Sequence, residues 1–141
     1  MKIAMVVLMC AVTVARAESL EEQRFKADKT KQLQLSIDAM NKSCGTSITG
    51  RFEWSAFKYD DFQHVMGAPS FQVAPNAVES ACRGGDDAKA AVKKAIKTIV
   101  IKPGVGTETK LDLANGELDL FMLAGHSINH EQANAWVLKH L

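Results

Sequence analysis

The stretch IKTIVIKPGVGTETKLDLANGELDLFML, residues Ile96 to Leu123, decides the fold. Its β-branched residues and its alternation of apolar and charged side chains predict three successive antiparallel strands. These strands are expected at Ile96–Lys102, Thr109–Ala114 and Glu117–Leu123. The alternation fits a sheet with one packed and one wet face, because successive side chains of a strand point to opposite faces. Such a meander has only one face to bury, so helices must cover it.

Turn-forming residues mark the two connections of this meander. Pro103 and Gly104 end the first strand, because proline cannot donate to a strand ladder and glycine adopts turn geometry easily. Asn115 and Gly116 separate the second and third strands, and both residue types accept the positive φ of a type I′ turn. The sequence therefore predicts a tight hairpin at Asn115-Gly116.

Residues 1–17 have the pattern of a secretory signal peptide. An uncharged apolar run extends from Ile3 to Val14, and Ala15–Ala17 matches an A-x-A cleavage site. The run is shorter than the roughly 20 residues that span a bilayer, which disfavours a membrane anchor. Cys10 lies in the middle of the run and not at its end, which disfavours a lipoprotein. We predict an exported protein, periplasmic or extracellular, that begins at Glu18.

Composition restricts the partners of the exported chain. Removing 17 of the 141 residues leaves 124, the size of a single domain, 18–141. This part carries 15 Lys and Arg against 16 Asp and Glu, so no basic excess is available to bind nucleic acid or an anionic membrane. It has no second long apolar segment. We expect a soluble domain with no membrane span and no nucleic-acid partner.

The exported chain retains two cysteines, Cys44 and Cys82. An even number of cysteines in an oxidising compartment usually pairs, so we predict a Cys44–Cys82 disulfide. Closing a loop of this length stabilises the fold by about 3–4 kcal/mol in the chain-entropy model. Metal ligation or redox chemistry is the alternative, and the absence of a CxxC motif disfavours it.

The remaining elements are predicted from apolar spacing and capping residues. Helices are expected at 18–43, 57–66 (a short turn before an irregular loop), 76–82, 86–95 and 129–141, with a fourth strand at 47–54. Asn76 with Glu79, and Asn129 with Gln132, have the spacing of helix-starting capping boxes. Asp86 is expected to cap the helix that follows Gly84-Gly85.

Together these elements predict an α+β fold. An antiparallel sheet of about four strands, the meander 96–123 plus the strand 47–54, packs on helices on one face. The first helix contributes an apolar stripe of four residues spaced four, three and four apart. This stripe consists of Leu33, Ile37, Met40 and Cys44, and Gly45 follows as a C-terminal cap.

Two histidine-containing clusters are candidate metal sites. Asp60, Asp61 and His64 could bind a metal or transfer a proton. His126 and His130 have a four-residue spacing, but a helix that starts near residue 129 leaves His126 in a loop. Solvated surface residues are the simpler interpretation of both clusters. No metal or other cofactor is therefore predicted.

The aromatic residues between the fourth strand and the second cysteine allow two interpretations. Phe57, Tyr59, Phe62 and Phe71 could close the edge of the core or form a contact surface for a partner. The turn Val105–Thr109 is the other candidate contact surface. Sequence alone does not separate core from surface at these positions.

Motifs for nucleophilic or cofactor chemistry are absent. The sequence has no G-x-S-x-G elbow, no Walker phosphate loop and no CxxCH haem motif. We therefore expect a non-catalytic exported domain that binds a protein, as an inhibitor, accessory or envelope factor would. The alternatives are a metal-binding protein or metal-dependent hydrolase using Asp60, Asp61 and His64, and a carrier of small apolar ligands.

Several segments resemble those of small secreted bacterial proteins that have no assigned activity. The resemblance rests on Asn41–Gly45, the aromatics of Phe52–Phe57, Cys82, Ile96–Ile99 after a lysine-rich helix, and Gly116–Leu118. It extends over most of the exported chain. It implies no activity and no catalytic residue.

Overall fold

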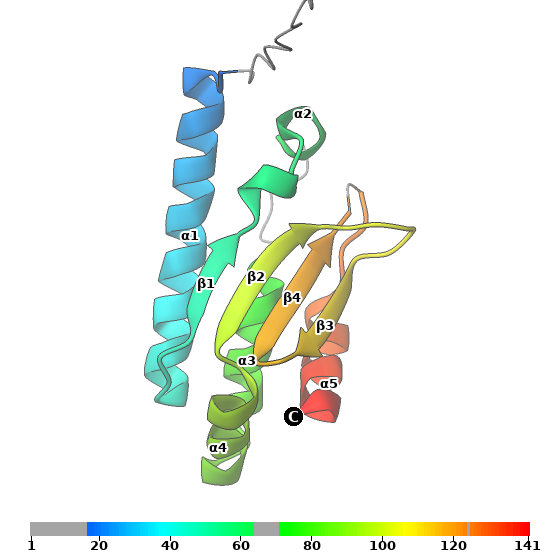
Figure 1. Ribbon diagram of the computed structural model, residues 1–141. Coiled ribbons are helices and arrows are strands. Elements are labelled where there is room, and N and C mark those ends of the chain that lie inside the picture. Colours follow the sequence, from blue (N-terminus) through cyan, green and yellow to red (C-terminus); the bar gives the residue numbers. More distant parts are fainter. Residues whose placement is uncertain (1–16, 64–70, 124) are drawn as a thin grey trace, which may run out of the picture.

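The computed structural model describes residues 17–63, 71–123 and 125–141 and has an α+β fold (Figure 1). The strands are β1 (Thr49–Phe52), β2 (Thr98–Pro103), β3 (Lys110–Ala114) and β4 (Glu117–Met122). The helices are α1 (Leu20–Cys44), α2 (Tyr59–Phe62), α3 (Val73–Cys82), α4 (Asp86–Ala95) and α5 (His130–His140), with a 3-10 turn η1 (Trp54–Ala56).

The four-stranded sheet is mixed and mostly parallel, so the prediction of an antiparallel meander is wrong. The strand order is β1-β2-β4-β3. β1 pairs with β2 in parallel, β2 pairs with β4 in parallel, and only β3 and β4 are antiparallel. After β2 the chain crosses to the edge of the sheet and forms β3 there. It then turns back through the hairpin and places β4 between β2 and β3.

Burial explains why β4 and not β3 takes the central position. Leu118 and Leu120 of β4 are fully buried, whereas their partners on β3, Leu113 and Leu111, keep some exposure. An edge position leaves more of a strand in water, and it suits the more polar of the two strands. β2 is buried along a continuous run, Ile99–Ile101, which is the pattern of an interior parallel strand.

The predicted hairpin between β3 and β4 is confirmed. Asn115 and Gly116 have φ of 53° and 80°, as a type I′ turn requires. Ala114 and Glu117 close the hairpin as its first cross-strand pair. A fourth strand near residues 47–54 is also confirmed, although β1 is shorter than predicted and Trp54 already belongs to η1.

The helix-capping predictions have mixed outcomes. α1 ends at Gly45, which has a left-handed φ of 66°, and α5 begins with the predicted Asn129–Gln132 capping box. The predicted start of α3 at Asn76 is wrong, because the helix begins at Val73. Pro75 fits its first turn, where backbone N–H groups have no partner within the helix. α4 begins after Gly85, so Asp86 is its first residue and not its cap.

The helices cover one face of the sheet. α3 and α5 lie behind the strands in Figure 1, and α1 runs beside β1. The predicted α1 stripe is its buried face, and it packs against α3 and β1. The Cys44–Cys82 disulfide, with an S–S distance of 2.05 Å, links the C-terminal ends of α1 and α3. Among the described helices, none covers the opposite face, which is called the open face below.

Candidate functional site

The outer edge of β3 is the first part of the candidate site. The hairpin makes Ala114 and Glu117 a hydrogen-bonded pair, and bonding alternates along an antiparallel ladder. The N–H and C=O groups of Leu111 and Leu113 therefore point away from β4. Within the described part of the chain, neither residue takes part in a backbone hydrogen bond outside the sheet ladders. β3 thus presents unpaired backbone groups along the side of the molecule.

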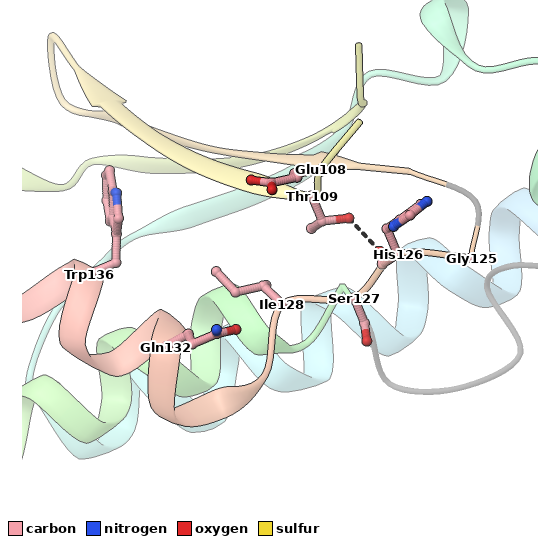
Figure 2. A pocket seen from close by; sticks show the side chains of 8 residues that line it. All are labelled: Glu108, Thr109, Gly125, His126, Ser127, Ile128, Gln132 and Trp136. Atoms are coloured by element: carbon pink, nitrogen blue, oxygen red, sulfur yellow. Dashed lines mark hydrogen bonds between the residues drawn. The ribbon is translucent and has the colours of Figure 1, made fainter. Parts of the chain in front are cut away.

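A groove of about 630 Å³ lies beneath the start of this strand, between β3 and α5. Its lining comes from the loop before β3, from the segment before α5 and from α5 itself. The lining residues are Glu108, Thr109, Gly125, His126, Ser127, Ile128, Gln132 and Trp136. Figure 2 shows the side chains of Glu108, Ile128 and Trp136 directed into the same space. The groove therefore combines a mostly polar lining with one apolar patch, formed by Ile128 and Trp136, and one carboxylate, that of Glu108.

Hydrogen bonds fix the loop that forms the floor of the groove. The Thr109 hydroxyl donates to the carbonyl of His126 and accepts from the backbone N–H of Leu123 at 3.1 Å. Asn129 accepts from the N–H of Gln132 at 2.8 Å and so fixes the start of α5. Thr109 thus ties the beginning of β3 to the connection that leads into α5.

Trp136 is held by its own helix. Its ring stacks on that of His140, with centroids 3.8 Å apart and planes 13° apart. A ring nitrogen of His140 lies 2.7 Å from the carbonyl oxygen of Trp136. The tryptophan ring is partly exposed and packs on that of His140.

The side chains of β3 that face away from the groove carry charge. Lys110 and Asp112 are exposed on the open face, two residues apart. The ammonium group of Lys110 lies 5.3 Å from the centroid of the Phe121 ring, and Lys102 lies 5.8 Å from the same ring. The edge therefore offers a positive and a negative group side by side.

Behind this edge, an ion-pair network crosses the open face. Lys102 Nζ lies 3.0 Å from Glu117 Oε1 and 2.6 Å from Asp119 Oδ2, and Arg51 Nη2 lies 3.5 Å from Glu117 Oε2. The hydrogen bond from Lys102 lowers the pKa of Glu117, and burial raises the pKa of Asp119. These charges are already paired across strands, which leaves Lys110 and Asp112 as the groups at the edge.

The structure describes the predicted metal candidates only in part. Asp60 and Asp61 are exposed on α2, and His64 lies outside the described residues. His126 is in the loop before α5 and His130 is the first residue of that helix, so they do not share a helical face. Within residues 17–63, 71–123 and 125–141, no group of three or more His, Cys, Asp or Glu could hold a metal ion.

His126 and Ser127 are neighbours in the groove lining, but they do not form a nucleophile–base pair. Figure 2 shows their side chains pointing in opposite directions. No hydrogen bond joins them within the described part of the chain. The chemistry that the lining supports is contact with an apolar or cationic group, because it combines Trp136, Ile128 and the Glu108 carboxylate.

The four predicted contact aromatics fall into two groups. Phe62 exposes 7% and Phe71 1% of its surface, and Phe71 packs edge-on against Phe52 at 5.3 Å between centroids. These two rings have little surface left for a partner. Phe57 and Tyr59 are partly exposed and line a second hollow of about 540 Å³ beside α1.

The groove was only partly visible in the sequence. The turn Val105–Thr109 was predicted as a contact surface, and its last two residues line the groove. Ile128 and Trp136 were missed as site residues. The spacing of Ala133, Trp136, Val137 and Leu141 predicts an apolar helix face that packs in the core, which gives Trp136 no separate role. No local sequence pattern indicates that the C-terminal helix lies beside an edge strand.

Comparisons with known proteins identify no relative. No family model, curated protein or solved structure matches the chain. None of the described helices combines the length and the apolar character needed to cross a membrane. The geometry of β3 and the adjacent groove is therefore the basis for a functional proposal.

Proposed function

We propose that this protein is a non-catalytic, exported binding domain that takes an extended segment of a protein as an added strand along β3. The observation that carries the proposal is the juxtaposition of a strand edge with a groove. Strand addition uses these two features: backbone hydrogen bonds supply affinity, and alternate side chains occupy pockets. The predicted signal peptide and the disulfide support export.

In this proposal the two faces of the added strand have distinct roles. Its backbone would bond to the outward N–H and C=O groups of Leu111 and Leu113. Side chains on one face would enter the groove and pack on Ile128 and Trp136. Side chains on the other face would lie beside Lys110 and Asp112, which are exposed on the open face. A partner segment should therefore alternate between apolar and charged residues.

Trp136 is the residue whose removal tests the proposal. Heptapeptides are selected from a random library on the oxidised chain 18–141, and their affinities are measured by calorimetry. Trp136→Ala should weaken binding about tenfold or more, because buried aromatic anchors dominate such interfaces. Leu138→Ala is the matched control, since Leu138 lies on the same helix, is 59% exposed and does not line the groove.

Amide hydrogen exchange tests the backbone part of the proposal. Bound peptides should slow exchange at Leu111 and Leu113, whose N–H groups point outward, relative to the peptide-free protein. Peptides that bind equally well to Trp136→Ala, or that leave exchange at both amides unchanged, would place the contact surface elsewhere. Near-ultraviolet circular dichroism checks that both variants remain folded.

A further inference from the structure

We propose that the strand accepted at this edge is β3 of a second copy of the chain, so that two sheets join about a two-fold axis at Leu111. This inference rests on the proposed function, because it uses the same edge and names the occupant. It follows from the charge pattern of β3, KLDLA, and from which of its backbone groups point outward.

Four two-fold registers pair the outward groups of one β3 with those of another. Their axes pass through Lys110, Leu111, Asp112 or Leu113, and each keeps Lys110 and Asp112 on the same face in both copies. An axis at Lys110 or Asp112 places two like charges directly opposite each other. An axis at Leu113 overlaps only the end of β3 with the hairpin turn. These three arrangements lack a favourable charge contact.

The axis at Leu111 is the complementary register. It places Lys110 of each copy opposite Asp112 of the other, which gives two opposite-charge pairs across the seam. These are non-hydrogen-bonded positions of an antiparallel ladder, where Cα atoms approach to about 4.5 Å and side chains are closest. Leu111 meets its own counterpart at the centre, and the overlap extends from Glu108 to Ala114.

The same register also covers the groove. The two copies present the same face, so their helix layers lie on the same side of a continuous eight-stranded sheet. The grooves beneath the two β3 strands then meet at the seam, and the half-exposed Ile128 and Trp136 of both copies lose contact with water. Joining the sheets also removes an open strand edge, which otherwise pairs with any exposed strand.

A charge-reversal cycle in the oxidised chain 18–141 tests this register. The dimer dissociation constant is measured by sedimentation equilibrium for the wild type, Lys110→Glu, Asp112→Lys and the double variant. Each single reversal replaces two attractive pairs by two repulsive ones and should weaken dimerisation about tenfold or more. The double reversal restores two opposite-charge pairs and should return the constant to within a few-fold of the wild type.

The control is Lys31→Glu, a reversal at an exposed position of α1, which should leave the dimer unchanged. A wild type that stays monomeric at millimolar concentration overturns the inference. A dimer that the double reversal does not restore overturns the register at Leu111. If the wild type is monomeric but peptide binding still depends on Trp136, the inference fails and the proposed function stands. If the wild type is monomeric and peptide binding does not depend on Trp136, both the inference and the proposed function fail.

Discussion

At the scale of single residues, the carboxylate of Asp119 on the open face is hydrogen-bonded through only one of its two oxygens. Its Oδ2 accepts a hydrogen bond from Lys102 at 2.6 Å, whereas its buried Oδ1 has no partner among the described residues. Burial is the largest influence on Asp119 and raises its pKa above 3.8, against the opposing effect of Lys102. The neighbouring Glu117 has a lowered pKa because Lys102 bonds to it.

The raised pKa predicts the pH dependence of an Asp119→Asn variant. A group with a raised folded-state pKa contributes stability below its unfolded pKa, about 3.8, and loses it as the pH rises through the folded pKa. Asparagine lacks this loss. The free energy of unfolding of Asp119→Asn, relative to the wild type, should therefore increase from pH 3.5 upward, by about 1.4 kcal/mol for each unit by which the pKa is raised.

Urea titrations at intervals across this range measure the difference. The matched control is Asp112→Asn, since Asp112 pairs across the ladder with Asp119 but is exposed. A difference for Asp119→Asn that stays flat or decreases with pH would contradict the assignment of a raised pKa to this carboxyl group.

At the scale of elements, α1 lies close against the backbone of β1 at Gly50. A Cβ atom at this position would lie 2.6 Å from Cγ1 and 2.9 Å from Cδ1 of Ile37, which is fully buried. Glycine thus allows the helix to pack directly on the backbone of the strand. Gly50→Ala should lower the free energy of unfolding by about 1–3 kcal/mol, because the side chains of the core cannot move aside freely.

Chemical denaturation checks this prediction. Thr49→Val is the control, because Thr49 is exposed on the open face of the same strand, where its hydroxyl contacts Thr98 at 3.1 Å. It should change stability by no more than about 0.5 kcal/mol. Equal stability of Gly50→Ala and the wild type would show that α1 can shift away from β1 without loss of packing.

Most elements could be predicted because their signals are local. Asn115-Gly116 specifies the hairpin, Asn129 with Gln132 specifies the start of α5, and Gly45 specifies the end of α1. Strand order is not local, and sequence neighbours need not be sheet neighbours. The run Ile99–Ile101 carried the missed signal, because apolar residues on both faces fit an interior parallel strand better than one strand of an open meander.

The candidate site was harder to predict than the fold for the same reason. The groove forms where the loop before β3 meets α5, and these segments are separated along the chain by the hairpin. Trp136 fits a core position and a groove position equally well by its spacing alone. Phe62 and Phe71 are the opposite case. Their loop-like sequence surroundings suggest a surface position, whereas tertiary packing buries both rings.

At the scale of the whole molecule, the disulfide joins the C-terminal ends of two helices of the helix layer, α1 and α3. Cys44 and Cys82 expose 3% and 1% of their surfaces and are separated by 38 residues. The bridge therefore restricts a long loop of the unfolded chain. Replacing both residues by alanine should lower the free energy of unfolding by about 3–4 kcal/mol in the chain-entropy model, with loss of sulfur packing adding to this.

Reductant separates the effect of the bridge from that of packing. The wild type in excess reductant should lose most of what the Cys44→Ala, Cys82→Ala double variant loses, because breaking the bond frees the loop while both sulfur atoms remain. The double variant itself should be insensitive to reductant. A wild type whose denaturation midpoint does not move when free-thiol titration shows full reduction would mean that the helix layer, and not the bridge, holds α1 against α3. In that case the groove beside α5 would keep its shape in a reducing compartment, and the disulfide would no longer support export.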